Sequence, residues 1–256
     1  MAQIIAIANQ KGGVGKTTTA VNLAASLAVA EKRTLLVDLD PQANTTSGVG
    51  VDPHAIDATV YQALLGEAEV AQILQETGLD LLQLLPANPD LIGAEVELIS
   101  ALARENKLKL ALAGITDQFD YVLIDCPPSL GLLTINALTA ADSVLIPLQC
   151  EYYAMEGLSQ LINTIRLIQR ELNPGLKIRG ILLTMFDARN NLSHQVSEEI
   201  RAHFTAQVFE TMIPRNVRLS EAPSHGLPAL LYDISSRGAA AYLELAREII
   251  RMESFS

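Results

Sequence analysis

The stretch Gln10-Lys11-Gly12-Gly13-Val14-Gly15-Lys16-Thr17-Thr18 decides the fold. It follows a short apolar run and precedes a helical stretch near 17–30, which is the context of a phosphate-binding loop. Its glycines let backbone N–H groups approach phosphate oxygens without an intervening Cβ, and the following helix points its positive end at the same anion. Lys16 is placed to reach the β- and γ-phosphates, and the Thr17 hydroxyl can ligate Mg²⁺.

Short apolar runs alternate with helical stretches along the chain. Several runs are continuously apolar, as in strands that are covered on both faces. This alternation predicts an α/β fold, with a mostly parallel twisted sheet and helices on both faces. Residues 41–78 are polar and less regular, and we interpret them as a long functional loop with one or two short helices. Without a linker or an internal repeat, we expect a single domain over residues 1–256. The expected strands are Ile4–Ala8, Thr34–Val37, Leu79–Leu85, Tyr121–Ile124, Ser143–Pro147 and Ile178–Thr184, and the expected helices lie near 17–30, 90–113, 131–140, 155–171, 192–203 and 238–251.

The composition excludes several classes of protein. Of the 256 residues, 49% are apolar and 18% are charged, which is not the composition of a disordered chain. Two cysteines do not make a disulfide scaffold, and no apolar run reaches the length of a membrane span. The amino-terminal residues lack the basic start of a signal peptide. We therefore expect a cytoplasmic protein.

The net charge of −11 argues, as a total, against nucleic acid as a partner. The charge is distributed unevenly, however. Residues 1–162 contain seven basic and nineteen acidic side chains, whereas residues 163–256 contain eleven basic, ten of them Arg, and ten acidic. The carboxyl-terminal part could therefore present arginines to an anion, or it could be an ordinary mixed surface.

The loop departs from the usual P-loop pattern at its start. Gln10 stands where that pattern has a glycine, and Lys11 is an additional basic residue. This variant resembles the deviant Walker A loop of the ParA/MinD family of P-loop ATPases. The resemblance implies that Lys11 crosses a dimer interface and touches the phosphates of the partner subunit, so that ATP joins two copies. A surface lysine that only adds positive potential is the alternative. The ATP-binding residues expected here are Lys11, Gly12, Gly13, Val14, Gly15, Lys16, Thr17 and Thr18.

Carboxylates end two of the expected strands. Asp125 ends Tyr121-Val-Leu-Ile-Asp and is followed by Cys126-Pro-Pro-Ser; this segment resembles the family's Walker B and switch II, so Asp125 is expected, with Thr17, to hold Mg²⁺. Asp38-Leu-Asp40-Pro-Gln resembles switch I. By that resemblance Asp40 orients the attacking water, and Asp38 is expected to assist Mg²⁺ or Lys16. The expected catalytic residues are Lys11, Lys16 and Asp40.

Two segments of the carboxyl-terminal third, 182–190 and 213–224, resemble the chromosome-partitioning (Soj or ParA) branch of the family. The resemblance implies that Pro214 and Asn216 line an adenine pocket. It also implies that Arg189 and Arg218 bind DNA phosphates, a task that suits the planar guanidinium group. Surface ion pairs with Asp187 or Glu221 are the alternative for these two arginines. Contacts of this kind would be non-specific in sequence and sensitive to salt.

The family resemblance implies a slow, partner-stimulated ATPase that acts in chromosome or plasmid segregation. Its cofactors would be ATP and Mg²⁺, and its partners non-specific DNA on the nucleoid, a ParB-like centromere-binding protein and a second copy. The stripe Tyr242, Leu243, Ala246, Ile249 and Ile250 is expected to pack within the fold rather than on a membrane. Three alternatives stay open: a MinD-like membrane-associated division-site ATPase, an enzyme of the same fold that activates a small molecule with ATP, and a nucleotide-gated scaffold with negligible turnover.

Overall fold

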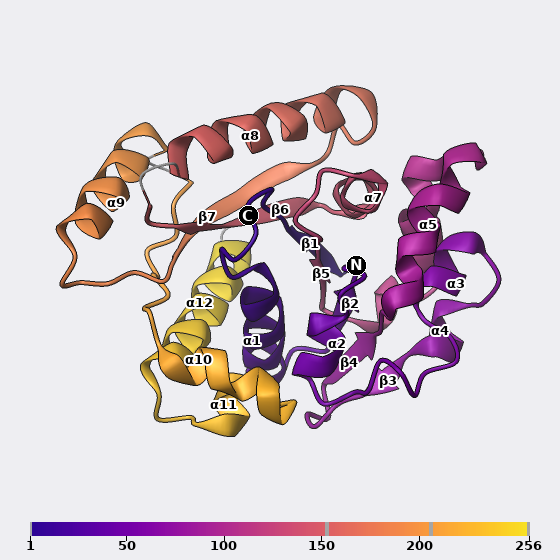
Figure 1. Ribbon diagram of the computed structural model, residues 1–256, viewed down its shortest axis with the longest axis horizontal. Helices are drawn as coiled ribbons and strands as arrows, with labels where there is room; N and C mark the ends of the chain where they lie inside the picture. Colours follow the sequence, from indigo (N-terminus) through magenta and orange to yellow (C-terminus); the bar gives the residue numbers. More distant parts are fainter. Residues whose placement is uncertain (1, 152–153, 205–206, 255–256) are drawn as a thin grey trace.

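A seven-stranded sheet runs through the computed structural model, which describes residues 2–151, 154–204 and 207–254 (Figure 1). The strand order is β3-β4-β2-β5-β1-β6-β7, and every neighbouring pair is parallel except β3 with β4. The parallel sheet of the α/β prediction is thereby confirmed. The strands are β1 (Gln3–Ile7), β2 (Thr34–Asp38), β3 (Gln75–Glu76), β4 (Leu82–Leu85), β5 (Tyr121–Asp125), β6 (Ser143–Gln149) and β7 (Lys177–Thr184).

Helices cover both faces of the sheet, which explains why the inner strands are apolar throughout. Every residue of β2 and β5 is buried. One face packs against α1 and α10–α12, and the other packs against α3–α9 (Figure 1). The helices are α1 (Lys16–Val29), α2 (Asn44–Gly48), α3 (Val60–Leu65), α4 (Val70–Ile73), α5 (Ile92–Glu97), α6 (Lys107–Leu112), α7 (Leu132–Ala140), α8 (Ala154–Glu171), α9 (Asn191–His203), α10 (Val217–Glu221), α11 (Ala229–Tyr232) and α12 (Arg237–Ser254).

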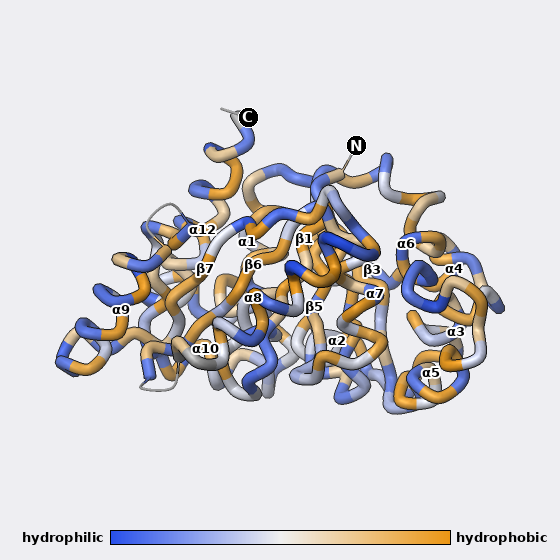
Figure 2. Tube along the Cα trace, turned by 90° about the horizontal axis from the view of Figure 1, so that it is seen from above, coloured by the Kyte–Doolittle hydropathy of each residue, from blue (hydrophilic) through white to orange (hydrophobic). Residues whose placement is uncertain are grey.

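The carboxyl-terminal helix α12 lies beside α1 (Figures 1 and 2). Its residues Tyr242, Leu245, Ala246 and Ile249 are buried in the same core as Leu23 and Leu27 of α1. The Tyr242 hydroxyl also lies 3.1 Å from that of Thr19. The apolar stripe is thus used for internal packing, as expected. In the described part of the chain, no helix has the length and apolar character needed to cross a membrane.

Two segments differ from the sequence-based expectation. The single helix expected over 90–113 is divided into α5 and α6 by 3-10 turns at Leu98–Ser100 and Arg104–Asn106. Ala103, between these turns, has a left-handed backbone with φ 50°, which ends a regular helix. Residues 41–78 contain three short helices, α2–α4, and the edge strand β3, which is more regular structure than expected.

Candidate nucleotide-binding site

The loop between β1 and α1 forms an open cradle at the carboxyl end of the sheet. Gly13 and Gly15 have left-handed backbones, with φ of 74° and 88°, which glycine adopts without strain. A Cβ on Gly12 or Gly13 would meet no atom within 4 Å, so the backbone faces open space. The loop is anchored at both sides: Lys11 N–H donates to Asn9 Oδ1 at 3.0 Å, and Thr184 Oγ1 donates to the Val14 carbonyl at 2.8 Å. This geometry suits a phosphate chain.

Asp125 is hydrogen-bonded both to Thr17, just after the phosphate loop, and to Thr45 of α2. The hydroxyls of Thr17 and Thr45 both donate to its Oδ2 at 2.7 Å, whereas its buried Oδ1 has no hydrogen-bond partner. Burial raises the pKa of Asp125 to about 6, against the opposing hydrogen bonds of the two threonines. A divalent cation would satisfy the orphaned oxygen and favour the ionised form. The hydroxyl and carboxylate oxygens are suitable ligands for Mg²⁺, so Thr17 and Asp125 fit the role expected of them.

Lys16 and Asp40 lie in the same buried site. Lys16 Nζ donates to the Lys11 carbonyl at 3.2 Å. Burial lowers the pKa of Lys16, while the charges of Asp125, Cys126 and Asp40 act in the opposite direction. Asp40 is also buried, and its Oδ1 accepts from the Gln42 N–H at 3.0 Å. Within the described residues, the other carboxylate oxygen of Asp40, Oδ2, makes no side-chain hydrogen bond.

Asp38 makes its hydrogen bonds to Thr46 and to the backbone of Asp40, and the expectation that it assists Mg²⁺ or Lys16 stays a prediction. Its Oδ2 accepts from both the backbone and the hydroxyl of Thr46, at 2.8 and 2.7 Å, and its Oδ1 accepts from the Asp40 N–H at 3.1 Å. Burial, followed by the charge of Asp125, raises the pKa of Asp38 to about 7. Asp38 therefore fixes α2 and the backbone of Asp40 in place.

The Lys11 side chain forms an ion pair with Glu151, just after β6. Both side chains are 45% exposed. Lys11 thus makes no contact with Asp125 or Lys16 through its ammonium group, and its charge is held at the surface beside the phosphate loop. This position leaves the lysine able to reach a molecule that approaches this face.

Pro214 and Asn216 line a pocket of about 130 Å³ together with Gly15, Thr18 and Tyr242. The segments 184–190 and 213–218 are paired directly. Phe186 N–H donates to the Ile213 carbonyl and Arg215 N–H to the Phe186 carbonyl, each at 3.0 Å. The pocket opens next to the phosphate loop, as the proposed adenine site requires. Residues 16–18 are therefore close to both the cradle and the pocket.

Arg189 and Arg218 form the local ion pairs that the sequence analysis left open as the alternative. Arg189, with its side chain 90% exposed, pairs bidentately with Asp187 at 3.0 and 3.1 Å. Arg218 pairs with Glu221 at 2.8 Å and Asp233 at 3.2 Å. The charge of the exposed Arg215 also acts on Asp187, so two arginines adjoin one carboxylate on this rim. Arg218 thus has two carboxylate partners, whereas Arg189 has one.

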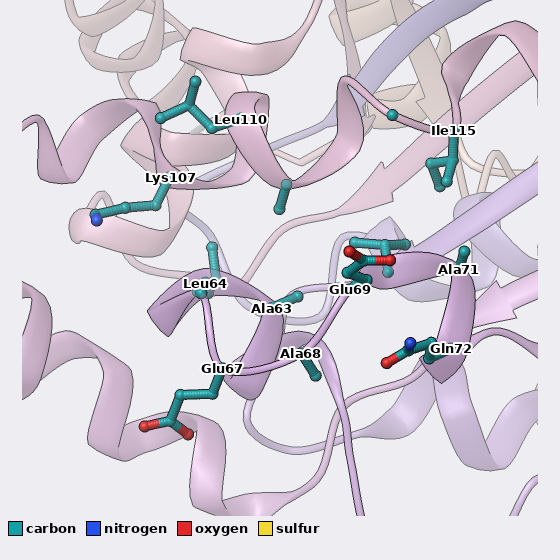
Figure 3. Close-up of a pocket in the computed structure, with 14 residues that line it drawn as sticks. Ala63, Leu64, Glu67, Ala68, Glu69, Ala71, Gln72, Lys107, Leu110 and Ile115 are labelled. Carbon is teal, nitrogen blue, oxygen red and sulfur yellow. The ribbon is translucent and has the colours of Figure 1, made fainter.

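A second cavity lies apart from the nucleotide site. It has a volume of about 730 Å³ and lies between the α3–α4 turn and α6, lined by Glu67, Glu69 and Lys107 among apolar side chains (Figure 3). None of its lining residues belongs to the phosphate loop.

Sequence reasoning missed three residues of the site: Thr45, Thr46 and Glu151. The run Asn44-Thr45-Thr46-Ser47 directly after the switch-like segment was a usable signal, because hydroxyl side chains gather where a short helix begins beside a carboxylate. Glu151 is 140 residues from Lys11, and no spacing rule pairs them.

Comparison with known proteins decides the family. A model of the AAA domain matches residues 2–178. The chain is 61% identical to the chromosome partitioning protein ParA of Myxococcus xanthus, over 98% of this chain and 89% of the relative. It is 59% identical to the sporulation initiation inhibitor protein Soj of Bacillus subtilis, over 97% and 98% of the two chains. The chain belongs to the ParA/Soj family of chromosome-partitioning ATPases.

A solved structure of the same fold carries a nucleotide. Cobyrinic acid a,c-diamide synthase from Mycobacterium smegmatis, crystallised with ADP and magnesium, superposes with a TM-score of 0.88, covering 99% of this chain and 96% of that one at 42% identity.

Proposed function

We propose that the chain dimerises when it binds ATP, binds DNA non-specifically as that dimer, and leaves DNA after a ParB-like partner stimulates hydrolysis. This cycle would place it on the nucleoid in its ATP state. The chain is an ATPase whose cofactors are ATP and Mg²⁺, as its family membership states. The dimer proposal rests on the different burial of two lysines. Lys16 is buried in the chain's own site, whereas Lys11 lies at the surface.

The residues of the chain divide the work of hydrolysis. The backbone of residues 12–17 and Lys16 bind the phosphates, and Thr17 with Asp125 would hold Mg²⁺, which neutralises phosphate charge when bound. Asp40 orients the attacking water, and Asp38 with Thr46 keeps the backbone of Asp40 in position. Lys11 supplies a positive charge to the phosphates of the second subunit, since no arginine occupies the cradle.

We assign DNA binding to the rim formed by the paired segments 184–190 and 213–218, which carry Arg189, Arg215 and Arg218. An ion pair this exposed is screened by solvent and contributes little, so a DNA phosphate can displace Asp187 from Arg189 at little cost. A dimer presents two such rims, which compensates for the acidic remainder of the chain. Binding of this kind reads backbone charge rather than base sequence.

Two variants test the cycle. Asp40→Ala should abolish phosphate release from ATP yet keep an ATP-dependent dimer that binds DNA. Lys16→Ala should lose both, because its own phosphates are no longer held. Dimerisation is measured by light scattering with ATP, and hydrolysis by phosphate release. Unchanged turnover in Asp40→Ala would overturn the role of Asp40, and an ATP-independent dimer in the wild type would overturn the cycle.

The likeness to cobyrinic acid a,c-diamide synthase supports one competing function, activation of a small molecule by ATP. The discriminating measurement is phosphate release with ATP and Mg²⁺ in the presence of DNA and no other acceptor. Hydrolysis under these conditions supports the partitioning cycle. Hydrolysis only when a small carboxylic acid is added would favour the synthetase-like reaction.

A further inference from the structure

A helical stretch beside switch II has an apolar face that no other part of the described chain covers. The 3-10 turn Pro89–Leu91, α5 and the 3-10 turn Leu98–Ser100 follow one another without interruption. Leu91, Ala94 and Leu98 are buried in the core on one side. On the other side Ile92, Val96 and Ile99 are 66%, 70% and 62% exposed. Their spacing of four and three residues forms one stripe on a helix, which we name the α5 ridge (Figure 1).

The surroundings of the α5 ridge are acidic. Residues 34–103 contain eleven Asp and Glu and no Lys or Arg. Three of these acids lie around Tyr61, which contacts α5: Glu97 accepts from the Tyr61 hydroxyl at 2.8 Å, and the charges of Glu97, Glu67 and Asp90 all act on Tyr61. The first basic residue after this span, Arg104, donates to the Ile99 carbonyl and to Glu105, at 2.8 and 2.9 Å. Its charge is therefore already paired.

These charges decide which occupant fits the ridge. A second copy of the chain in a symmetric contact would place the same acids against one another, and like charges across an interface are unfavourable. An anionic membrane surface or a nucleic acid would meet the same repulsion. A helix with an apolar face and flanking Lys or Arg would bury the ridge and pair with Asp90, Glu67 and Glu97. Helices of this kind bind apolar surfaces through residues at the same three- and four-residue spacing.

The ridge is connected to the nucleotide site by one close contact. Glu95, on α5, places its Oε1 against the Cα of Gly131, where the Cβ of any other residue would collide with it. Gly131 caps the start of α7 and ends the segment that follows Asp125. Glu95 therefore packs against the backbone of the segment that follows Asp125, so α5 and this segment adjoin one another.

We propose that the α5 ridge is the docking surface for a cationic amphipathic helix of the partner that stimulates hydrolysis, and that Glu95 transmits docking to switch II. The proposal rests on the proposed function, since it names the surface through which that partner acts. Ile92, Val96 and Ile99 supply the binding surface, the surrounding acids select a basic partner, and the contact of Glu95 with Gly131 couples binding to turnover.

The binding test uses the full chain and a fluorescein-labelled 18-residue peptide of Lys and Leu arranged with one apolar helical face. Fluorescence anisotropy without nucleotide should show binding that weakens with salt. The triple variant Ile92→Ser, Val96→Ser, Ile99→Ser should weaken it about tenfold or more, as expected for a central apolar cluster. The control triple Val29→Ser, Leu167→Ser, Ile234→Ser changes exposed apolar residues elsewhere, at 50%, 50% and 69% exposure, and should bind like wild type. A scrambled peptide and one with Glu for Lys should not bind.

The coupling test measures phosphate release from Mg·ATP with and without the peptide. Wild type should be stimulated, the ridge triple should not, and Glu95→Ala should bind the peptide without being stimulated. Equal peptide binding by the ridge triple and wild type would overturn the proposal. So would loss of ATP-dependent dimerisation in the ridge triple, because the ridge would then belong to an interface between copies. Failure of the proposed function would give a different result: the wild-type chain would neither hydrolyse ATP nor bind DNA, with or without the peptide.

Discussion

Lys11 and Glu151, 140 positions apart in sequence, form an ion pair at the edge of the phosphate loop. Under the proposed cycle Lys11 must exchange this carboxylate for the phosphates of a second subunit. The pair is half exposed, and pairs of this kind contribute about 0–1 kcal/mol. Glu151 is therefore a weak competitor for Lys11, strong enough to tune dimerisation but not to prevent it.

Glu151→Gln should tighten the ATP-dependent dimer by up to about fivefold, because Lys11 no longer leaves a carboxylate on dimerisation. Sedimentation equilibrium with ATP in Asp40→Ala, which removes hydrolysis, measures the dissociation constant. Glu199→Gln, an exposed acid on α9, is the matched control and should have no effect. An unchanged or weaker dimer in Glu151→Gln would contradict the exchange.

Thr46 holds switch I to the sheet. Its hydroxyl donates to Asp38 and accepts from the Ala87 N–H at 3.0 Å. Thr46→Val should lower the free energy of unfolding by about 1–3 kcal/mol, because it leaves buried polar groups without partners. Thr46→Ser keeps the hydroxyl and should recover much of this loss. Urea unfolding measures both variants, and equal stability of Val and Ser at this position would be inconsistent with the hydrogen bonds.

Asp38 makes the stability of the nucleotide-free chain depend on pH. Its pKa is about 7 in the folded chain against a usual 3.8, so between about pH 4 and 7 the folded chain binds a proton that the unfolded chain releases. Protonation then favours the folded form, and this contribution to stability falls as pH rises through that window. Urea unfolding from pH 4.5 to 7.5 should show the fall, and Asp38→Asn should flatten its part above about pH 6, since Asp125, whose pKa is raised to about 6, adds to the slope only below that pH. The same slope in Asp38→Asn would mean that another group titrates.

Much of the fold and site could be predicted from local sequence. The continuous apolar run 121–124 ended by Asp125 predicted a buried central strand, and the glycines at 12, 13 and 15 predicted the cradle. The break between α5 and α6 could not be predicted, because Ala103 takes a left-handed conformation with no Gly or Pro to mark it. β3 has only two residues, so no periodic pattern exists to detect.

Contacts between residues that are distant in sequence could not be predicted either. Asp38 was expected to assist Mg²⁺ or Lys16, but its hydrogen bond with Thr46, eight residues further along the chain, was not predicted. Nor does sequence state which charges pair: Arg189 and Asp187 are neighbours, whereas Lys11 and Glu151 are brought together only by the β1–β6 pairing. The types of residue in the site were predictable, but their partners depended on the tertiary structure.

Arg189→Ala should weaken DNA binding and make it less sensitive to salt. Each phosphate contact contributes about 0.9 to the slope of log affinity against log salt, so the loss of two contacts per dimer should reduce the slope by about 1.8. Arg33→Ala removes an arginine whose charge is likewise paired, with Asp120, and it serves as the control. Equal slopes for Arg189→Ala and wild type would remove Arg189 from the DNA surface.

The central claim is that the ATP-bound dimer, and no other state, binds DNA without sequence preference. Its most direct test is retention of the wild-type chain on double-stranded DNA of arbitrary sequence over a series of salt concentrations, with Mg·ATP, with Mg·ADP and with no nucleotide. We predict retention with ATP alone, falling steeply and linearly on a log–log scale as salt rises. Equal retention in all three states, or none with ATP at low salt, would contradict the account.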